Sequence, residues 1–168
     1  MQSYTRHLMG RAQRVLTSIA SYRLITNDLG RSLQMTARRP DVARETSYYL
    51  ANIGKVKTVE EFIGDHRLFA YAMRAFGLAD LIYAKAFIKK VLTEGIDNPN
   101  SIANKLTDPR FREFVATFNF ARYGELATSL ERAQHGVVDK YVRQVLEEGA
   151  GQQNEGVRLA LYFQRKAP

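Results

Sequence analysis

Apolar residues recur at helical spacing along most of this chain, which predicts a succession of α-helices. In residues 129–148, for example, Leu130, Val137 and Tyr141 follow one another at intervals of seven and four positions, which places them on one helix face. No segment alternates apolar and polar residues between hairpin turns, as a half-buried strand would. We therefore expect an all-α fold, a multi-helix bundle. The predicted helices cover residues 18–37, 41–53, 58–64, 66–76, 78–95, 101–106, 129–148 and 154–166, with one more that begins at Pro109.

Proline and glycine mark the ends of several predicted helices. Pro40 suits the first turn of the second helix. Gly54 and Gly77 are suited to stop the helices that precede them. Ser129 is expected to cap the long helix, and the two glycines of the Gly149-Ala-Gly segment are expected to end it.

Two stretches in the middle of the chain repeat one pattern of polar and apolar residues at an offset of 43 positions. A hydroxyl, an aspartate, an arginine and two apolar positions all recur. Thr58, Asp65, Arg67, Leu68 and Tyr71 match Ser101, Asp108, Arg110, Phe111 and Phe114. We interpret this pattern as two related helical units that are joined by the connecting helix over residues 78–95.

Each unit carries residues that favour the N-cap position of a helix. Thr58 and Glu61 form a capping-box pattern, in which the hydroxyl accepts from the Glu61 amide and the Glu61 carboxylate reaches back. Asp65, Ser101 and Asp108 precede the other three helices of the two units. We predict that Thr58, Asp65, Ser101 and Asp108 are structural caps.

The same two aspartates are the strongest candidates for chemistry. Two carboxylates brought together could share a proton or bind a metal, so a metal-supported hydrolase using Asp65 and Asp108 is an alternative. A cap, however, explains each aspartate without the other. The chain has no cysteine, no GxGxxG motif and no Walker-type phosphate loop, and its histidines (His7, His66 and His135) lack HExxH spacing. We therefore expect no enzyme, no cofactor and no metal site.

Positive charge is concentrated near the N-terminus. The net charge is +8, and residues 1–39 hold seven arginines against one aspartate. We predict a basic N-terminal arm over residues 1–17 and a single all-helical domain over residues 18–168. The arm is expected to be a mobile tail; the alternative is an arm that binds nucleic acid or another anionic surface. The candidate anion contacts are Arg6, Arg11 and Arg14.

Other charged and aromatic residues are expected to be structural or solvated. Lys85, Lys89 and Lys90 form a small cationic face on the connecting helix. Tyr48 and Tyr49 could stack on bases, but helical spacing places Tyr49 in the core and Tyr48 at its edge. No run approaches the 18 apolar residues of a transmembrane segment, and the lack of cysteine fits a reducing compartment, so we expect a cytoplasmic protein.

Several sequence blocks resemble a family of bacterial proteins of unknown function. The blocks are YYLANI at 48–53, AMRAFGL at 72–78, AKAF at 84–87, ANKLTD at 103–108 and NEGVRLALYF at 154–163. Members of the family are typical of alphaproteobacteria and are often encoded among flagellar genes. The resemblance runs from residue 18 to the C-terminus, and it implies an all-helical protein with a link to flagellar assembly or motility. It implies no activity, cofactor or catalytic residue.

These observations lead to one function hypothesis and one alternative. The hypothesis is a non-enzymatic interaction or assembly protein, flagellum-associated, that binds a protein partner or a second copy of itself. The alternative is binding of nucleic acid or an anionic surface through the basic arm. The resemblance implies that related chains carry a further helical unit, so this chain could be a fragment whose missing unit covers Leu161, Tyr162 or Phe163. We then expect either a self-association contact through the last helix or an exposed apolar patch beside it. If Val157, Leu161 and Phe163 are instead all fully buried within one monomer, with no apolar groove beside them, the chain is complete.

Overall fold

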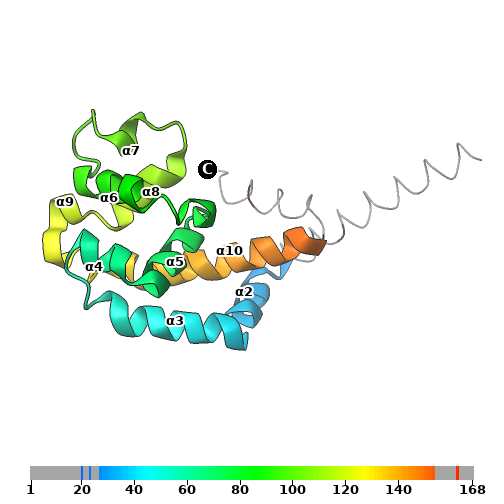
Figure 1. Ribbon diagram of the computed structural model, residues 1–168. Helices are drawn as coiled ribbons and strands as arrows, with labels where there is room; N and C mark the ends of the chain where they lie inside the picture. The colour runs from blue at the N-terminus through cyan, green and yellow to red at the C-terminus, as the bar shows by residue number, and fades with distance from the viewer. Residues whose placement is uncertain (1–19, 21–22, 24–26, 154–161, 163–168) are drawn as a thin grey trace, which may run out of the picture. The chain divides into compact units, whose positions relative to one another are not determined.

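This computed structural model describes residues 20, 23, 27–153 and 162 of the chain (Figure 1). Within these residues the regular structure is helical and no strand forms, so the predicted all-α fold is confirmed. The chain makes two compact units, one of residues 38–144 and one of residues 1–37 with 145–168. The predicted arm over residues 1–17 lies outside the described residues.

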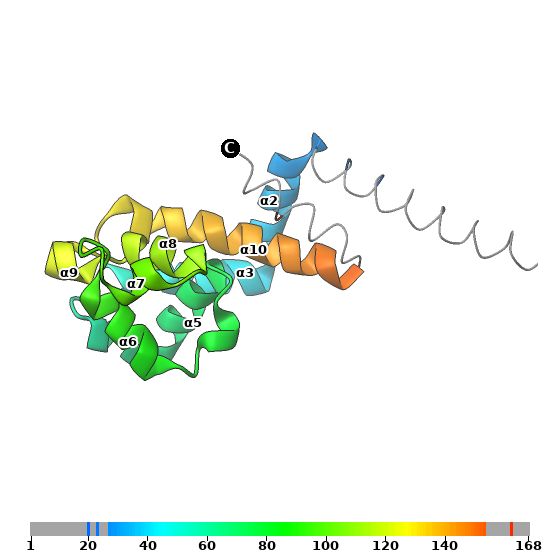
Figure 2. The same ribbon diagram turned by 90° about the horizontal axis from the view of Figure 1, so that it is seen from above.

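The larger unit contains most of the described helices. They are α3 (Pro40–Ile53), α4 (Val59–Gly64), α5 (His66–Ala75), α6 (Lys85–Glu94), α7 (Ile102–Lys105), α8 (Pro109–Thr117), α9 (Phe120–Tyr123) and the first part of α10 (His135–Gln153). Single 3-10 turns occupy Ala79–Leu81, Gly124–Leu126 and Glu131–Ala133. Of the smaller unit, the structure describes α2 (Leu29–Ala37) and the end of α10. Helix α5 packs on α3 and α4, while α6 contacts α4, α7, α8 and α9 (Figure 2).

A cluster of phenylalanine rings forms the centre of the larger unit. Phe62 on α4 is fully buried. The four rings around it have centroids 4.7 to 6.4 Å from its own, within the range of favourable aromatic pairs. These neighbours are Phe69, Phe114, Phe118 and Phe120. Phe111 and Phe114 on α8 and Phe118, the residue that follows this helix, are all buried.

Three stacked tyrosines join α3, α5 and α10 within the same unit. The ring of Tyr71 lies 4.5 Å from that of Tyr49 and 3.8 Å from that of Tyr141, both nearly parallel. The Tyr49 hydroxyl donates to the carbonyl oxygen of Ala133 at 2.6 Å, and the Tyr71 hydroxyl pairs with that of Thr46 at 2.9 Å. Burial raises the pKa of all three tyrosines. The prediction that Tyr49 belongs to the core is confirmed.

The predicted connecting helix over residues 78–95 is wrong in its first part. Gly77 ends α5 with a φ of +69°, and its amide bonds to the Arg74 carbonyl. The amide of the next residue, Leu78, reaches back to the Met73 carbonyl, which completes a Schellman motif. Leu78 is fully buried there. The motif turns the chain away from a continuous helix, a 3-10 turn follows, and α6 begins only at Lys85.

The long C-terminal helix also differs from its prediction at both ends. Ser129 does not cap it, because α10 begins at His135. Contacts distant in sequence hold the preceding segment out of helix: the buried Thr128 hydroxyl donates to the Val56 carbonyl, and the Ala133 carbonyl accepts from Tyr49. At the other end, the two glycines at positions 149 and 151 do not stop the helix, which continues to residue 153. Glycine lowers helix stability by only about 1 kcal/mol, so its presence does not force an end.

Candidate interaction surface

Asp65 caps α5 and also holds a tyrosine. Its Oδ1 accepts from the amides of Arg67 and Leu68, both at 3.0 Å, and its Oδ2 accepts from the Tyr48 hydroxyl at 2.8 Å. The hydrogen bond to this carboxylate raises the pKa of Tyr48. The guanidinium of Arg67 lies 3.8 Å from the centre of the Tyr48 ring and pairs with Glu45. Tyr48 is therefore a half-buried rim residue, as predicted, and the arginine occupies one face of its ring.

Asp108 caps α8 in the same way. Its Oδ1 accepts from the Arg110 amide at 2.9 Å, and its Oδ2 accepts from the Arg110 guanidinium at 2.6 and 2.9 Å. The same guanidinium donates to the carbonyl of Gly77, which ties the start of α8 to the end of α5. Each aspartate thus caps its own helix. Within the part of the chain that the structure describes, no group of three or more His, Asp or Glu side chains gathers where a metal ion could bind.

The capping box at the start of α4 is present. The Thr58 hydroxyl accepts from the Glu61 amide at 3.1 Å, as predicted. The Glu61 carboxylate reaches back to the amide of Lys57 at 2.7 Å, one residue before the cap. These bonds satisfy one amide in the first turn of α4 and one amide just before its N-cap.

The predicted cap at Ser101 is wrong. Ser101 occupies the N-cap position of α7, but its side chain makes no capping hydrogen bond. The amide of Ile102 donates instead to the Glu94 carboxylate at 2.9 Å, and the Ser101 hydroxyl accepts from the Asn104 side chain at 3.1 Å. The helix pairs α4–α5 and α7–α8 lie where the repeat predicted them. The two pairs differ in their first cap, which Thr58 provides and Ser101 does not. Their relation as two copies of one unit stays a prediction.

Most of the predicted contact residues lie outside the part of the chain that the structure describes. Arg6, Arg11 and Arg14 lie outside the described residues, as do Leu161 and Phe163. Tyr162 is described as helical and half-buried. The anion contacts and the C-terminal partner contact therefore stay predictions.

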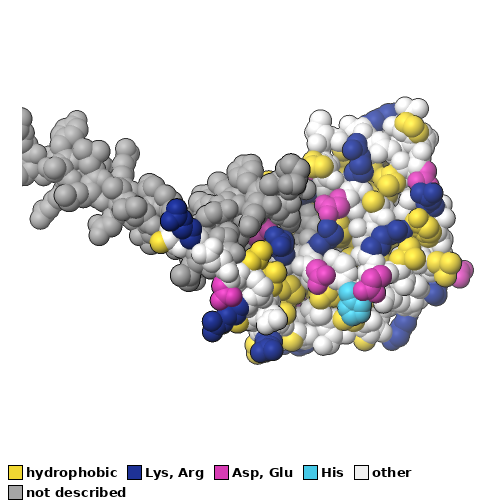
Figure 3. All heavy atoms as spheres, turned by 180° about the vertical axis from the view of Figure 1, so that it is seen from behind, with side chains coloured by type: hydrophobic (Ala, Val, Ile, Leu, Met, Phe, Trp, Pro, Cys, Tyr) yellow, Lys and Arg dark blue, Asp and Glu magenta, His cyan; other side chains and the backbone are white. Residues whose placement is uncertain are grey.

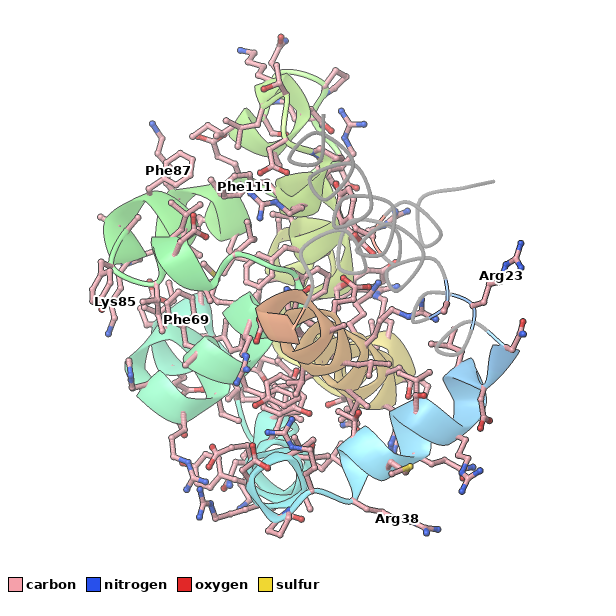
Figure 4. All side chains as sticks on the ribbon, turned by 90° about the vertical axis from the view of Figure 1, so that its right-hand side faces the viewer. Arg23, Arg38, Phe69, Lys85, Phe87 and Phe111 are labelled. Carbon is pink, nitrogen blue, oxygen red and sulfur yellow. The ribbon has the colours of Figure 1, made fainter. Side chains whose placement is uncertain are left out.

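The structure directs attention to a surface that the sequence did not single out. Tyr83, just before α6, has 90% of its side chain exposed, more than any other large apolar residue described. Phe87 is 37% exposed, although the next residue, Ile88, is fully buried. The centroid of the Phe87 ring lies 5.6 Å from that of the buried Phe111 ring, in an edge-to-face arrangement (Figure 4). One side of the Phe87 ring is therefore packed against the protein, and the rest is accessible to solvent.

The predicted cationic face lies beside these rings. Lys85, Lys89 and Lys90 are all exposed, as expected. Lys89 bonds to the Glu60 carboxylate on α4 at 2.8 Å, which lowers the pKa of Glu60. Lys85 and Lys90 make no ion pair with any described residue. We call the outward residues of this segment the α6 surface: Tyr83, Lys85, Ala86, Phe87, Lys89 and Lys90.

A shallow groove runs between α4 and α6. Its volume is about 310 Å³. A Cβ atom added to Gly64 would meet no other atom within 4 Å, so this glycine leaves one wall open. The residues that line the groove are Glu60, Ile63, Gly64, Lys85, Ala86 and Lys89. Its floor is therefore made of small and aliphatic groups, and charged side chains stand at its edges.

On the face seen in Figure 3, charge is mixed rather than gathered. There the Lys and Arg side chains of the described residues alternate with Asp and Glu and with hydrophobic groups. Helix α6 differs, because its sequence from Lys85 to Thr93 holds three lysines and no acid. No helix that the structure describes has the length and apolar character needed to cross a membrane.

The comparisons with known proteins fit this fold. Residues 75–168 match a family described as protein of unknown function, DUF1217. The chain belongs to this family. It is also similar to the crystal structure of protein AGR_C_984 from Agrobacterium tumefaciens, a structural genomics target. That likeness has a TM-score of 0.89 and 53% sequence identity, and covers 92% of this chain and 67% of that one. No curated protein matches this chain.

The sequence resemblance to an alphaproteobacterial family of unknown function is thereby confirmed. The matched stretch includes all of the α6 surface, whereas the groove residues on α4 precede it. Neither comparison carries a stated activity or partner.

Proposed function

We propose that this protein is a non-enzymatic interaction or assembly protein that works in the cytoplasm and is associated with the flagellum. The observation that carries the interaction part is the α6 surface. A tyrosine with 90% of its side chain exposed adds little to the packing of its own chain. Tyrosines and other aromatic residues at the centre of interfaces often supply much of the binding energy.

The flagellar part rests on different support. The chain belongs to its family on the evidence above, and the resemblance links members of that family to flagellar gene clusters. A cytoplasmic location is supported by the lack of cysteine in the sequence. The family's gene context and the lack of cysteine bear on where the protein acts, whereas the α6 surface bears on how it acts.

The decisive experiment is deletion of the gene, followed by measurement of swimming and counting of flagella. We expect reduced motility that the wild-type gene restores. The doubly substituted Tyr83→Ala and Phe87→Ala gene should fail to restore it. A matched control is Leu126→Ala, which removes a 64% exposed apolar side chain elsewhere. Normal motility and normal filaments in the deletion strain would remove the flagellar part of the proposal.

The interaction part has its own measurement. Purification of the tagged chain from its native cell, with quantitative mass spectrometry, should recover a protein that the Tyr83→Ala and Phe87→Ala chain recovers much less well. Light scattering of the purified chain detects self-association. A chain that recovers nothing above background and stays monomeric would contradict the interaction proposal.

The basic arm supports a second candidate, because residues 1–17 hold Arg6, Arg11 and Arg14 and no acid. Phosphate binding by arginines weakens steeply with salt, since binding releases counterions. DNA retention should then fall with salt and should disappear when residues 1–17 are removed. Equal and salt-insensitive retention by both forms would count against a role for the arm.

A further inference from the structure

We propose that the groove between α4 and α6 binds an acidic, partly apolar segment of a partner protein. The inference rests on the proposed function, because it names the chemistry of the partner that the interaction protein would recognise. The inference also names the binding site of that segment and the residues that determine which segments bind.

Charge is the first argument. Lys85 lines the groove, and Lys90, which lies outside the groove, follows five residues later on the same helix. Both are exposed and neither makes an ion pair with a described residue. Since α6 has no acid before Glu94, the positive field is not cancelled along its outer side. Carboxylates are the protein groups that complement such a field.

The one ion pair at the groove is exchangeable. The side chains of Lys89 and Glu60 are 51% and 63% exposed. Exposed pairs of this kind contribute about 0–1 kcal/mol, so a carboxylate from a partner can take the place of Glu60 at little cost. A basic ligand would gain nothing here, because the groove is lined by two lysines, Lys85 and Lys89, and one acid, Glu60, which already pairs with Lys89.

The floor of the groove adds an apolar contact. Ile63 is almost fully buried. Gly64 has no side chain to cover its backbone, and an added Cβ would meet nothing within 4 Å. A volume of about 310 Å³ is at the low end of binding sites for small molecules. It suits one or two apolar side chains of a polypeptide better than a cofactor. Tyr83 and Phe87, which lie on the outer part of the α6 surface, offer further apolar contact to a longer segment.

Two other anionic partners fit less well. A lipid surface is flat, whereas this site is concave, and each lysine contributes only about 1 kcal/mol to binding of anionic lipid. Two unpaired lysines therefore give weak membrane attachment. A nucleic acid would bring phosphates next to Glu60, which repels them. A peptide can place its carboxylates toward the lysines and its apolar groups toward Ile63 and Ala86.

A random 16-residue peptide library displayed on phage tests the proposal with the full chain as bait. Selected peptides should carry an excess of Asp and Glu around one or two apolar residues. Their synthetic forms should bind about tenfold more weakly to the Lys85→Glu, Lys90→Glu double variant, and more weakly as salt rises. Circular dichroism and thermal unfolding check that the exposed substitutions leave the fold intact.

A pair of glycine variants tests the groove itself. Gly64→Ala adds a methyl group to a residue that lines the groove, and this methyl group clashes with nothing, so the change should weaken peptide binding several-fold and leave the fold unchanged. Gly30→Ala is the matched control, because an added Cβ also meets nothing within 4 Å there, on a helix of the other unit. It should leave peptide binding unchanged.

Several results would overturn the inference. These are peptides without an acidic excess, peptides whose binding ignores both the lysine and Gly64 variants, or no enrichment at all. Stronger binding of the chain to phosphatidylglycerol vesicles than to any selected peptide would also overturn it, in favour of a membrane. If native partners are recovered equally by the wild type and the lysine double variant, the interaction proposal stands and this site fails. If peptides bind as described but no native partner is recovered and the chain stays monomeric, the proposed function fails instead.

Discussion

Replacement of Asp65 by alanine separates a structural cap from a residue kept for chemistry. The change removes three accepted hydrogen bonds, two from the first amides of α5 and one from the Tyr48 hydroxyl. Loss of an aspartate N-cap costs about 1 kcal/mol, with a range of 0.5–2. Loss of a partly exposed hydroxyl bond adds about 1 kcal/mol. We therefore expect the free energy of unfolding to fall by about 2 kcal/mol, and Tm to fall by roughly 4–8 °C.

The assay is urea unfolding followed by circular dichroism, with two companion variants. Asp65→Asn keeps an oxygen that can accept from both amides, so it should retain most of the stability. Tyr48→Phe removes the hydroxyl alone and should cost about 1 kcal/mol. The double variant Asp65→Ala, Tyr48→Phe should cost less than the sum of the two single changes, because they share one bond.

Two results would refute this reasoning. One is a loss below about 0.5 kcal/mol for Asp65→Ala, since the cap alone is worth at least that much. The other is an equal loss for Asp65→Asn and Asp65→Ala, which would mean that the negative charge matters and the accepted bonds do not. Either result would reopen the question of what Asp65 does.

Three further predictions concern the core and one glycine. Tyr49→Phe removes a buried hydroxyl and leaves its carbonyl acceptor without that donor, so urea unfolding should show a loss of about 1–3 kcal/mol. The raised pKa of Tyr49, Tyr71 and Tyr141 means that the folded state keeps these protons above pH 10, the ordinary tyrosine pKa. Stability should therefore be full below pH 10 and decline above it, by up to about 1.4 kcal/mol per pH unit for each tyrosine. Unfolding midpoints at pH 8 and 11 measure this decline, and Tyr141→Phe should reduce it; a flat profile would contradict the assignment. Gly95→Ala forces a side chain into a φ of +69° and brings its Cβ to 2.8 Å from an alanine methyl group, so Tm should fall. Gly64→Ala should not lower Tm, because Gly64 is helical and an added Cβ meets nothing within 4 Å there.

The caps were predictable because they are local. Asp65 and Asp108 each bond to amides two or three residues ahead, so the sequence around them holds all the information needed. The same reasoning failed at Ser101. There the first helical amide is taken by Glu94, eight residues earlier in the chain, which no capping rule considers. Local patterns therefore predict where a helix starts more reliably than they predict which side chain accepts hydrogen bonds from its first amides.

The ends of the longer helices were set by tertiary contacts. The segment before α10 is held out of helix by the buried Thr128 hydroxyl on the Val56 carbonyl, a bond that spans 72 residues. Periodicity alone extends the helix back to Ser129, because the apolar spacing continues through that segment. Leu78 is a similar case. Its apolar side chain is buried, as that of a residue on the inner face of a continuous helix would be, but its amide bonds to the Met73 carbonyl and terminates α5.

The α6 surface escaped prediction for a related reason. Spacing identifies residues that share a helix face, but it does not say how far the neighbouring helices cover that face. Four helices contact α6 and bury Ile88, Val91 and Leu92, yet their coverage stops short of Tyr83 and Phe87.

The buried and exposed aromatic residues of the larger unit therefore have different consequences. Phe62 and the tyrosine stack hold α3, α4, α5, α8 and α10 together, so changes there act on folding and affect binding only through it. Tyr83 contributes little packing, because only a tenth of its side chain is covered. Burying an aromatic side chain of this size against a partner is worth about 1.5–3 kcal/mol. A substitution of Tyr83 can therefore remove binding while the fold is kept. A test of an interaction protein requires such a substitution, because it separates an effect on binding from an effect on folding.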